Sequence, residues 1–377
     1  MNRLISNKLK NQLKTAIALA CLSLLHPHPA HADDDEYQYP VRQGETLESI
    51  ARNVVGDTRR WQQLQQINQV RDPRRIPVGT VLRIPLHLMR LKAGTAGITY
   101  LIGTVTVDGK PLTADQRLGE GAQLQTGDNG FVTLSLPDQS QVAVPPNSSI
   151  KLDFLKQSEV LPIVRSQIYL QRGRVESHVI PDGSSAPRLK IKTRQAVVGV
   201  RGTVFRVAVD DALDNRSATH TEVLQGSVKA TPQKAGEALQ IIEASYGAIV
   251  NDDGPQAPQA LSLAPDLSAV PRLQNRPIVR IPLPAMPGAT AFRVAVSTDE
   301  KNRMPFAEDV FPIDREAKFS DIPDGEYWLH VRAIAPSGLE GHDAILKIEL
   351  AARPEPPFLM QPASQAKLQT GEPRFQW

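Results

Sequence analysis

Cysteine is almost absent from this chain of 377 residues, which contains only Cys21. A single cysteine cannot form a disulfide within the chain, so the folded state must be held by side-chain packing. Aromatic residues make up only 5% of the sequence, whereas prolines number 31. This composition favours small β-rich domains separated by linkers, and the length predicts two to four of them.

The first 32 residues have the composition of a secretory signal peptide. Basic residues occur before position 15, a mostly apolar stretch covers 15–25, and Ala30-His31-Ala32 provides a small-x-small cleavage site. We therefore expect export to the periplasm or cell wall, with cleavage after Ala32. Lipidation of Cys21 is the alternative, although Ala18 stands where a lipobox usually has Leu. Cleavage after Ala32 removes the only thiol.

Long hydrophobic runs and a surplus of one charge are also missing. No later stretch approaches 18 apolar residues, so we expect no integral membrane segment after signal cleavage. The signal carries four basic and no acidic residues, and its removal changes the formal net charge from +3 to −1. The mature chain then lacks the basic surplus of nucleic-acid-binding proteins, and no nucleic-acid partner is predicted.

Catalytic and metal-binding motifs are not found. The histidines beyond the signal are isolated, without H-E-x-x-H or H-x-H spacing, which predicts no metal site. There is no G-x-S-x-G elbow, and the S-x-x-K matches at 148–151 and 364–367 have no S-D-N or K-T-G partner. A glycosidase needs only two carboxylates in a cleft, which spacing alone does not exclude. We predict no catalytic residue, no cofactor and no enzymatic activity.

A motif at 39–51 and a second segment at 76–85 stand out from this background. They read Y-P-V-R-Q-G-E-T-L-E-S-I-A and I-P-V-G-T-V-L-R-I-P. Residues 37–87 thereby resemble the LysM domain, a βααβ module that binds N-acetylglucosamine-containing glycans, in bacteria mostly peptidoglycan. Glu45 replaces the usual Asp, and Val78 replaces the usual Pro before the last Gly.

Local signals agree with this βααβ order. Thr46 is placed to cap a first helix that turns Leu47, Ile50 and Ala51 inward. Asp57 or Thr58 can cap a second helix, in which three apolar residues share one face, namely Trp61, Leu64 and Ile67.

The resemblance implies a shallow glycan-binding groove between the loop after the first strand and the loop before the second. Carried onto this chain, the groove consists of Gly44, Glu45, Thr46, Leu47, Asn68, Arg71, Pro73, Ile76 and Pro77. Backbone amides would bind the N-acetyl amide, and Leu47 and Ile76 would contact its methyl group. Such a groove offers few contacts, so a single module should bind weakly. The alternative is that these residues only shape the fold.

Residues 98–250 change to short alternating segments with Gly-rich turns, typical of a β-sandwich or β-solenoid. Asp108-Gly109 is a type I′ hairpin signal. Strands are expected around 104–107, 122–125, 131–136, 142–144, 168–170, 175–179 and 189–192.

Two stretches in this region carry a further resemblance. Residues 197–207 read V-V-G-V-R-G-T-V-F-R-V, and 222–228 read E-V-L-Q-G-S-V. They resemble the FecR domain, the periplasmic module of iron-dicitrate sensor proteins. A partner could bind at the first stretch, through Arg201, Gly202, Thr203 and Phe205. The structural alternative is that Gly202 permits a bend and Arg201 pairs internally.

The remaining chain predicts a linker, a third domain and a tail. Residues 251–277 are rich in Pro, Ala and Asp, as linkers are. Within 278–352, strands are expected at 291–297, 325–334 and 344–350, and the segment Asp324-Gly-Glu-Tyr327 resembles the tyrosine corner of fibronectin type III-like sandwiches. Residues 353–377 read as another linker and the first strand of a possible further module.

Together these features predict a multidomain, mainly β protein without catalysis. It would bind peptidoglycan or another N-acetylglucosamine-containing glycan through the LysM-like module. The FecR-like and sandwich domains would be presented to an envelope protein partner or a ligand. Two alternatives remain open: a periplasmic component of a FecR-type signalling system, and an accessory substrate-binding protein for a wall or polysaccharide enzyme.

Overall fold

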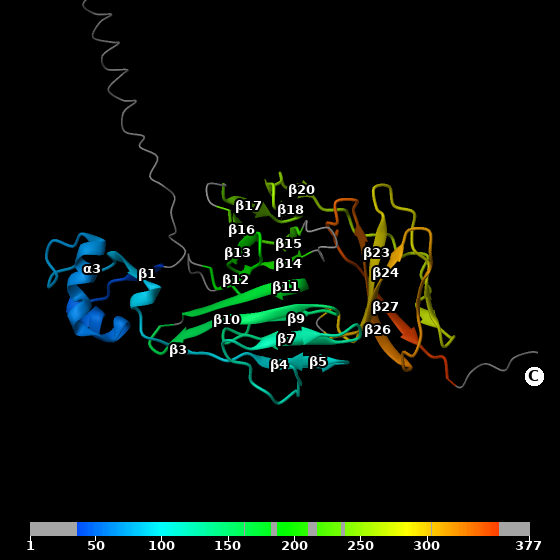
Figure 1. The fold of residues 1–377 in the computed structure, drawn as a ribbon, viewed down its shortest axis with the longest axis horizontal. Coiled ribbons are helices and arrows are strands. Elements are labelled where there is room, and N and C mark those ends of the chain that lie inside the picture. The colour runs from blue at the N-terminus through cyan, green and yellow to red at the C-terminus, as the bar shows by residue number, and fades with distance from the viewer. Residues whose placement is uncertain are drawn as a thin grey trace, which may run out of the picture.

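The computed structural model describes most of the chain (Figure 1), namely residues 36–161, 163–181, 187–209, 217–234, 238–302 and 304–353. Three parts follow one another along the long axis: an N-terminal domain (β1 to β2), a middle domain (β3 to β20) and a C-terminal domain (β21 to β27). The predicted signal peptide, its cleavage site, Cys21 and the possible further module lie outside the described residues, apart from the start of the tail at Arg353.

The N-terminal domain has the expected βααβ order. Strands β1 (Glu36–Pro40) and β2 (Val81–Pro85) pair antiparallel. Between them lie the helical segments α2 (Leu47–Ile50), η2 (Ala51–Val55), η3 (Thr58–Arg60) and α3 (Trp61–Asn68).

A short polar side chain caps the start of α2 and another caps the start of η3, as the sequence predicts. The Thr46 hydroxyl accepts a hydrogen bond from the Ser49 amide (3.1 Å), and the Ser49 hydroxyl accepts one from the Thr46 amide (2.9 Å). This reciprocal arrangement is a capping box. Asp57 begins η3 by accepting from the Arg59 amide at 3.0 Å.

The core of the N-terminal domain extends into the middle domain. Leu47, Ile50, Ala51 and Leu64 are buried, and Trp61 and Ile67 pack against them half-buried, so the predicted inward faces are confirmed. The same apolar cluster includes Leu161 and Ile163, which lie between β10 and β11. Because the two domains share this cluster, the connection between them is packed.

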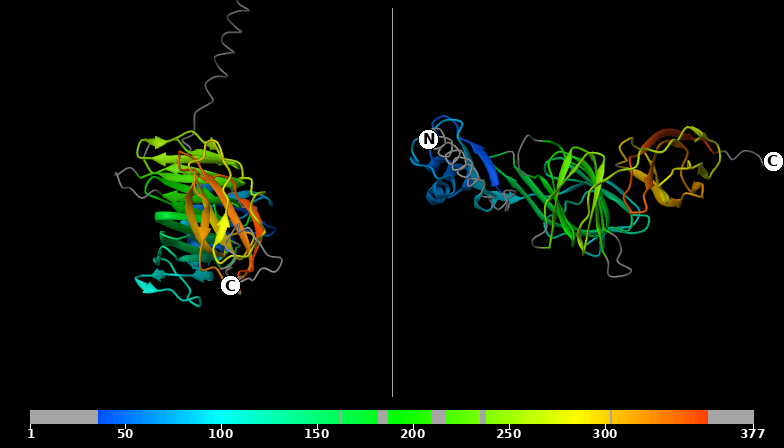
Figure 2. Two further views of the ribbon diagram at one scale, coloured as in Figure 1. Left: turned by 90° about the vertical axis from the view of Figure 1, so that its right-hand side faces the viewer. Right: turned by 90° about the horizontal axis from the view of Figure 1, so that it is seen from above.

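The middle domain consists of two β-layers, seen from above in the right panel of Figure 2. One layer contains β5 (Val105–Val107), β7 (Gln123–Thr126), β10 (Ser149–Ser158), the first part of β11, β12 (Leu189–Lys192), β13 (Ala196–Val200), β16 (Ser227–Pro232) and β17 (Gln240–Glu243). The other contains β4 (Gly97–Ile102), β8 (Phe131–Ser135), β9 (Gln141–Val144), the second part of β11, β14 (Val204–Val209), β15 (Thr219–Gln225), β18 (Tyr246–Asn251) and β20 (Gln259–Ala260). Short strands β3 (Leu91–Ala93), β6 (Lys110–Pro111) and β19 (Gly254–Pro255) extend their edges.

Strand β11 (Val164–His178) belongs to both layers. The sequence predicts two strands here, at 168–170 and 175–179, whereas the structure has one. Gly173, with a φ of 76°, turns the chain between the layers without ending the strand, and a Cβ there would lie 2.4 Å from the Ser148 hydroxyl. The two layers enclose one apolar core that includes Leu134, Ile150 and Phe205.

The C-terminal domain has two sheets around a second core. The larger sheet has the order β21 (Leu273–Gln274), β27 (Ala344–Leu350), β26 (Gly325–Ile334), β23 (Ala291–Ser297) and β24 (Pro305–Pro312). Strands β22 (Val279–Ile281) and β25 (Ala317–Phe319) form the smaller one. The bounds of β23, β26 and β27 agree with the predicted strands. The Tyr327 hydroxyl donates to the Pro323 carbonyl at 2.9 Å, which is the geometry of a tyrosine corner.

The segment 251–277 differs from a free linker. It contains β19, β20 and β21, which pair with strands of the middle and C-terminal domains. Leu261 is buried in a small cluster with Ile249 and Leu339, where the two domains meet. Burial of this apolar side chain orders a stretch whose composition alone suggests flexibility.

Candidate functional site

The two loops of the predicted glycan groove lie against each other. The Leu47 amide donates to the Pro73 carbonyl at 3.0 Å, and the Gly79 amide donates to the Val41 carbonyl at 2.8 Å. These backbone bonds hold the loop at 44–47 beside the loop at 71–77.

Glu45, which departs from the family pattern, closes the first turn. Its carboxylate accepts from the Arg42 amide at 2.8 Å and from the Tyr39 hydroxyl at 2.6 Å. Burial, together with the hydrogen bond to Glu45, raises the pKa of Tyr39 to about 12. The longer side chain therefore joins the turn to strand β1.

The nine predicted groove residues differ in what they can offer a ligand. Asn68 donates its amide to the Leu64 carbonyl (3.0 Å) and the Arg83 carbonyl (2.9 Å), and accepts from the Arg83 amide (2.7 Å). Leu47 is fully buried in the core. Both side chains hold the domain together. The exposed or half-buried members are Gly44, Glu45, Thr46, Arg71, Pro73 and Pro77, while Ile76 is 9% exposed.

The FecR-like motif at 197–207 forms a crossing between the two layers of the middle domain. Gly202, with a φ of 80°, joins β13 to β14, and a Cβ there would lie 2.7 Å from Pro181. The Thr203 hydroxyl donates to the Ser227 carbonyl at 3.1 Å, and Phe205 is fully buried. Arg201 is exposed, and no ion pair joins it to another residue in the described ranges, in contrast to the internal pairing considered from sequence.

A row of charged side chains on the middle domain was missed by sequence reasoning. Glu176, Arg206 and Glu222 stand side by side on adjacent strands β11, β14 and β15. Phe205 and Val207 face the core, so alternation places Arg206 on the outer face of the layer. The C-terminal domain covers that face, and Arg206 is only 2% exposed. The signal available in the sequence was Arg206, the one charged residue in the otherwise apolar strand β14.

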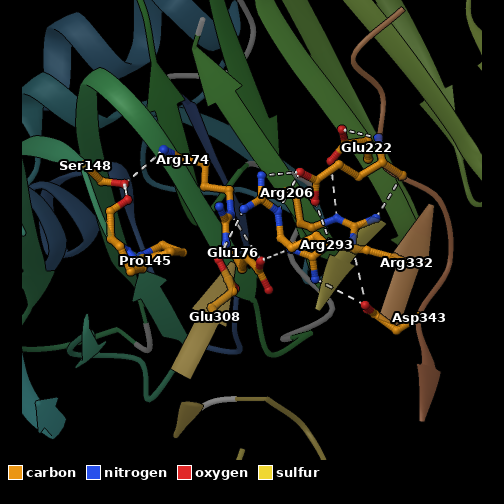
Figure 3. A network of polar contacts seen from close by, with 12 residues as sticks. Pro145, Ser148, Arg174, Glu176, Arg206, Glu222, Arg293, Glu308, Arg332 and Asp343 are labelled. Atoms are coloured by element: carbon orange, nitrogen blue, oxygen red, sulfur yellow. Dashed lines mark hydrogen bonds and ion pairs between the residues drawn. The ribbon is translucent and has the colours of Figure 1, made fainter. Parts of the chain in front are cut away.

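Arg206 contacts both domains, as Figure 3 shows. Its guanidinium pairs with Glu222 at 3.2 Å and donates to the Glu340 carbonyl at 3.0 Å and the Gly341 carbonyl at 2.7 Å. The Glu340 amide in turn donates to Glu222 at 3.0 Å.

The C-terminal domain contributes the opposing charges. Arg293 and Arg332 face each other across β23 and β26, an arrangement that would be repulsive alone. Arg332 binds Glu340 (2.5 Å), Asp343 (3.1 Å) and Glu176 of the middle domain (2.5 Å). Arg293 binds Glu340 at 2.7 Å. A further cross-domain ion pair joins Arg174 to Glu308.

The electrostatics of this network follow from burial and from the guanidinium groups. Burial acts to raise the pKa of Glu176, but Arg332, Arg174 and Arg206 outweigh it and lower the pKa to about 2. Burial raises the pKa of Glu222, against the opposing effect of Arg206. Glu176 is therefore anionic at neutral pH, whereas Glu222 binds a proton more readily than an ordinary glutamate.

Comparison with known families identifies two of the domains. A LysM domain model matches residues 39–85, and a FecR protein model matches residues 122–229. The chain therefore contains a LysM domain and a FecR domain, as their motifs suggested. Both are non-catalytic families, LysM being one that binds peptidoglycan or related glycans. They indicate an envelope protein with a sensing-like domain.

Solved structures show weaker similarity. Two crystal structures of a proposed anti-sigma factor from Parabacteroides distasonis are 18% identical, with TM-scores of 0.30 and 0.29. Each alignment covers 39% of this chain and 70% or 71% of the other. The extracellular domain of a proposed one-component system from B. thetaiotaomicron is 9% identical over 60% of this chain and 35% of that chain, with a TM-score of 0.17. A search of curated proteins finds no match.

Two further findings concern only the described part of the chain. No helix there combines the length and apolar character needed to cross a membrane. No group of three or more His, Cys, Asp or Glu side chains there could hold a metal ion.

Proposed function

We propose that this chain is an exported, non-catalytic envelope protein that attaches to peptidoglycan through its LysM domain. The LysM domain would occupy residues 37–87, the FecR domain 98–250 and a fibronectin type III-like sandwich 278–352. The last two would act as one unit that presents surfaces to an envelope partner. The signal-like segment before Asp33 supports export.

The backbone bond from Leu47 to Pro73 carries the glycan-binding proposal, because it brings together the two loops that bind glycan in the LysM family. In this chain, Gly44, Thr46, Pro73 and Pro77 would contact the sugar, with Ile76 beneath the acetyl methyl group. Leu47 and Asn68 would support these loops from within. Few contacts are available, so we expect weak binding by one module.

Retention on purified, insoluble peptidoglycan tests this proposal. Pro77 is exposed, so Pro77→Glu can place a carboxylate at the loop junction without disturbing the core. We expect several-fold weaker retention, because peptidoglycan itself carries carboxylates. Gln63→Glu adds the same charge on the exposed face of α3 and should be retained like the native chain. Equal retention of both variants would contradict the proposal.

Deletion of the LysM domain is a poorer test, because its core includes Leu161 and Ile163 of the middle domain. Removal would expose this apolar surface and could cause nonspecific adsorption. Point variants with unchanged melting curves avoid this problem. N-terminal sequencing of the protein recovered from the periplasm tests export separately, with Asp33 expected as the first residue.

A role in FecR-type sensing is the second candidate, supported by the FecR domain and by the exposed Arg201 at the layer crossing. A photoreactive residue at position 201 should crosslink an envelope protein in living cells. The same residue at Lys110, which is exposed on β6, should not. Equal crosslinking at both positions would argue against a specific partner at the crossing.

A further inference from the structure

A cavity of about 450 Å³ lies between the middle and C-terminal domains. Its walls come from β9, β11, β14 and β15 on one side, and from the turn at 300–302, β26 and β27 on the other. The volume falls in the range of roughly 300–1,000 Å³ that is usual for small-molecule sites. Such sites occur preferentially between domains, and neither domain forms this one alone.

Two buried polar atoms beside this cavity have neither a hydrogen-bond nor an ion-pair partner among the described residues, namely the Asn302 amide oxygen and the His330 Nε2. Asn302 and His330 are 7% and 3% exposed. Leu329 and Val331 face the core of the C-terminal domain, so alternation turns His330 toward the middle domain. Buried polar atoms are normally hydrogen-bonded, so these two indicate a place for a polar ligand.

The buried charged groups around the cavity already have partners, which limits the charge of a ligand bound inside it. Arg206 pairs with Glu222 and Asp343, and Arg332 pairs with both Glu176 and Asp343 (Figure 3). Glu300 and Lys301 also line the cavity, but both are exposed to solvent. An ionic ligand would bring a buried charge without a free counter-charge, which is costly. Burial also lowers the pKa of His330, which favours its neutral form at neutral pH.

The two available groups can accept hydrogen bonds from hydroxyl groups. The Asn302 oxygen only accepts, and Nε2 of the neutral His330 ring accepts or donates according to its tautomer. Apolar side chains, including half-buried Leu224 and exposed Ile345, supply another part of the lining. This combination matches a ring that carries hydroxyl groups at its edge and C–H groups on its face.

We propose that the cavity between the FecR and C-terminal domains binds a neutral, polyhydroxylated ligand of one or two sugar rings. Asn302 and His330 hydrogen-bond its hydroxyl groups, and Leu224 and Ile345 contact its C–H face. This site is separate from the LysM loops and does not depend on peptidoglycan binding.

Ligand-observed NMR on the full chain tests this site, with glucose and maltose as neutral probes and glucuronate and glucosamine as charged ones. Asn302→Gly removes the amide while suiting the left-handed backbone there (φ 52°). Asn147→Gly is the matched control, because Asn147 has a φ of 57° and is exposed outside this cavity. His330→Phe removes the second polar group and keeps a planar ring.

We expect at least one neutral probe to bind, and Asn302→Gly and His330→Phe each to weaken it about fivefold to tenfold. The Asn147→Gly control and the LysM variant Pro77→Glu should bind the probe like the native chain. A cavity that holds water only, shown by no binding of either neutral probe, would overturn the proposal. Equal binding by Asn302→Gly and the native chain, or tighter binding of the charged probes, would overturn it as well.

Discussion

Replacing Arg206 by Met should weaken the contact between the FecR and C-terminal domains. The substitution keeps an unbranched side chain of similar length but removes the guanidinium. Glu222, 3% exposed in its side chain, would lose its cation, and the Glu340 and Gly341 carbonyls would lose a donor. Removing one partner of a buried ion pair typically costs about 3–5 kcal/mol, and we expect this range at pH 7.

The double variant Arg206→Met/Glu222→Gln separates charge from packing. It removes the unpaired carboxylate, while the Gln oxygen can still accept from the Glu340 amide. Only the two unpaired carbonyls remain, which should cost about 1–3 kcal/mol. The double variant should therefore be more stable than the single variant Arg206→Met.

The loss of stability in Arg206→Met should depend on pH. Burial raises the pKa of Glu222 in the folded state, and loss of the Arg206 charge would raise it further. The folded state then holds a proton that the unfolded state releases, so stability falls as pH rises from the unfolded pKa of about 4.3 through the folded pKa. The penalty of Arg206→Met should be smallest near pH 4 and larger at neutral pH.

Hydrogen exchange measured by mass spectrometry can follow this interface directly. Amides of β14 and of the segment 339–343 should exchange about a hundredfold or more faster in Arg206→Met at pH 7, after correction for intrinsic rates. The double variant should recover part of this protection. Unchanged exchange in the single variant, or equal exchange in both, would refute the reasoning.

Three further predictions concern individual residues. Gly202→Ala should lower the melting temperature more than Gly121→Ala. Both glycines have left-handed φ values, but only a Cβ at position 202 would clash with another residue. Equal melting temperatures of the two variants would contradict this prediction. Asn68→Ala removes three hydrogen bonds and should lower the free energy of unfolding of the LysM domain by about 2 kcal/mol in urea titrations. An unchanged midpoint of urea unfolding would contradict this structural role. Tyr39 should titrate at about 12 by ultraviolet absorbance, and stability should fall between pH 10 and 12 because its folded pKa exceeds the unfolded value. Glu45→Gln should lower that pKa, and a Tyr39 titration near 10 in the native chain would be inconsistent with the bond to Glu45.

Local chemistry made much of the fold predictable from sequence. Thr46 and Asp57 cap helices because short polar side chains satisfy free amides at a helix start. Tyr327 has a partner only four residues away, so its corner could be read from a short segment. Alternation located β23, β26 and β27, whose inward residues repeat every second position.

Features that depend on distant residues could not be predicted. Arg206 and Glu340 are 134 positions apart, and only the folded chain shows that the C-terminal domain covers the outer face of β14. Asn68 matched a family position, yet its bonds to Arg83 reach across 15 residues and give it a structural role. Leu261 lies in a segment with linker composition, and its burial depends on Ile249 and Leu339.

Strand β11 connects the two domain interfaces within a single stretch of backbone. It starts just after Leu161 and Ile163 in the LysM core, and it carries Arg174 and Glu176 of the ionic network near its other end. Its 15 residues would span about 50 Å if straight, at about 3.3 Å per residue, and the turn at Gly173 shortens this distance. If the LysM domain is attached to the wall, a pulling force on the C-terminal domain that passes through β11 would follow covalent bonds within the strand. It would enter and leave the strand through an apolar cluster and ion pairs, so these non-covalent contacts would limit the force that the strand can transmit.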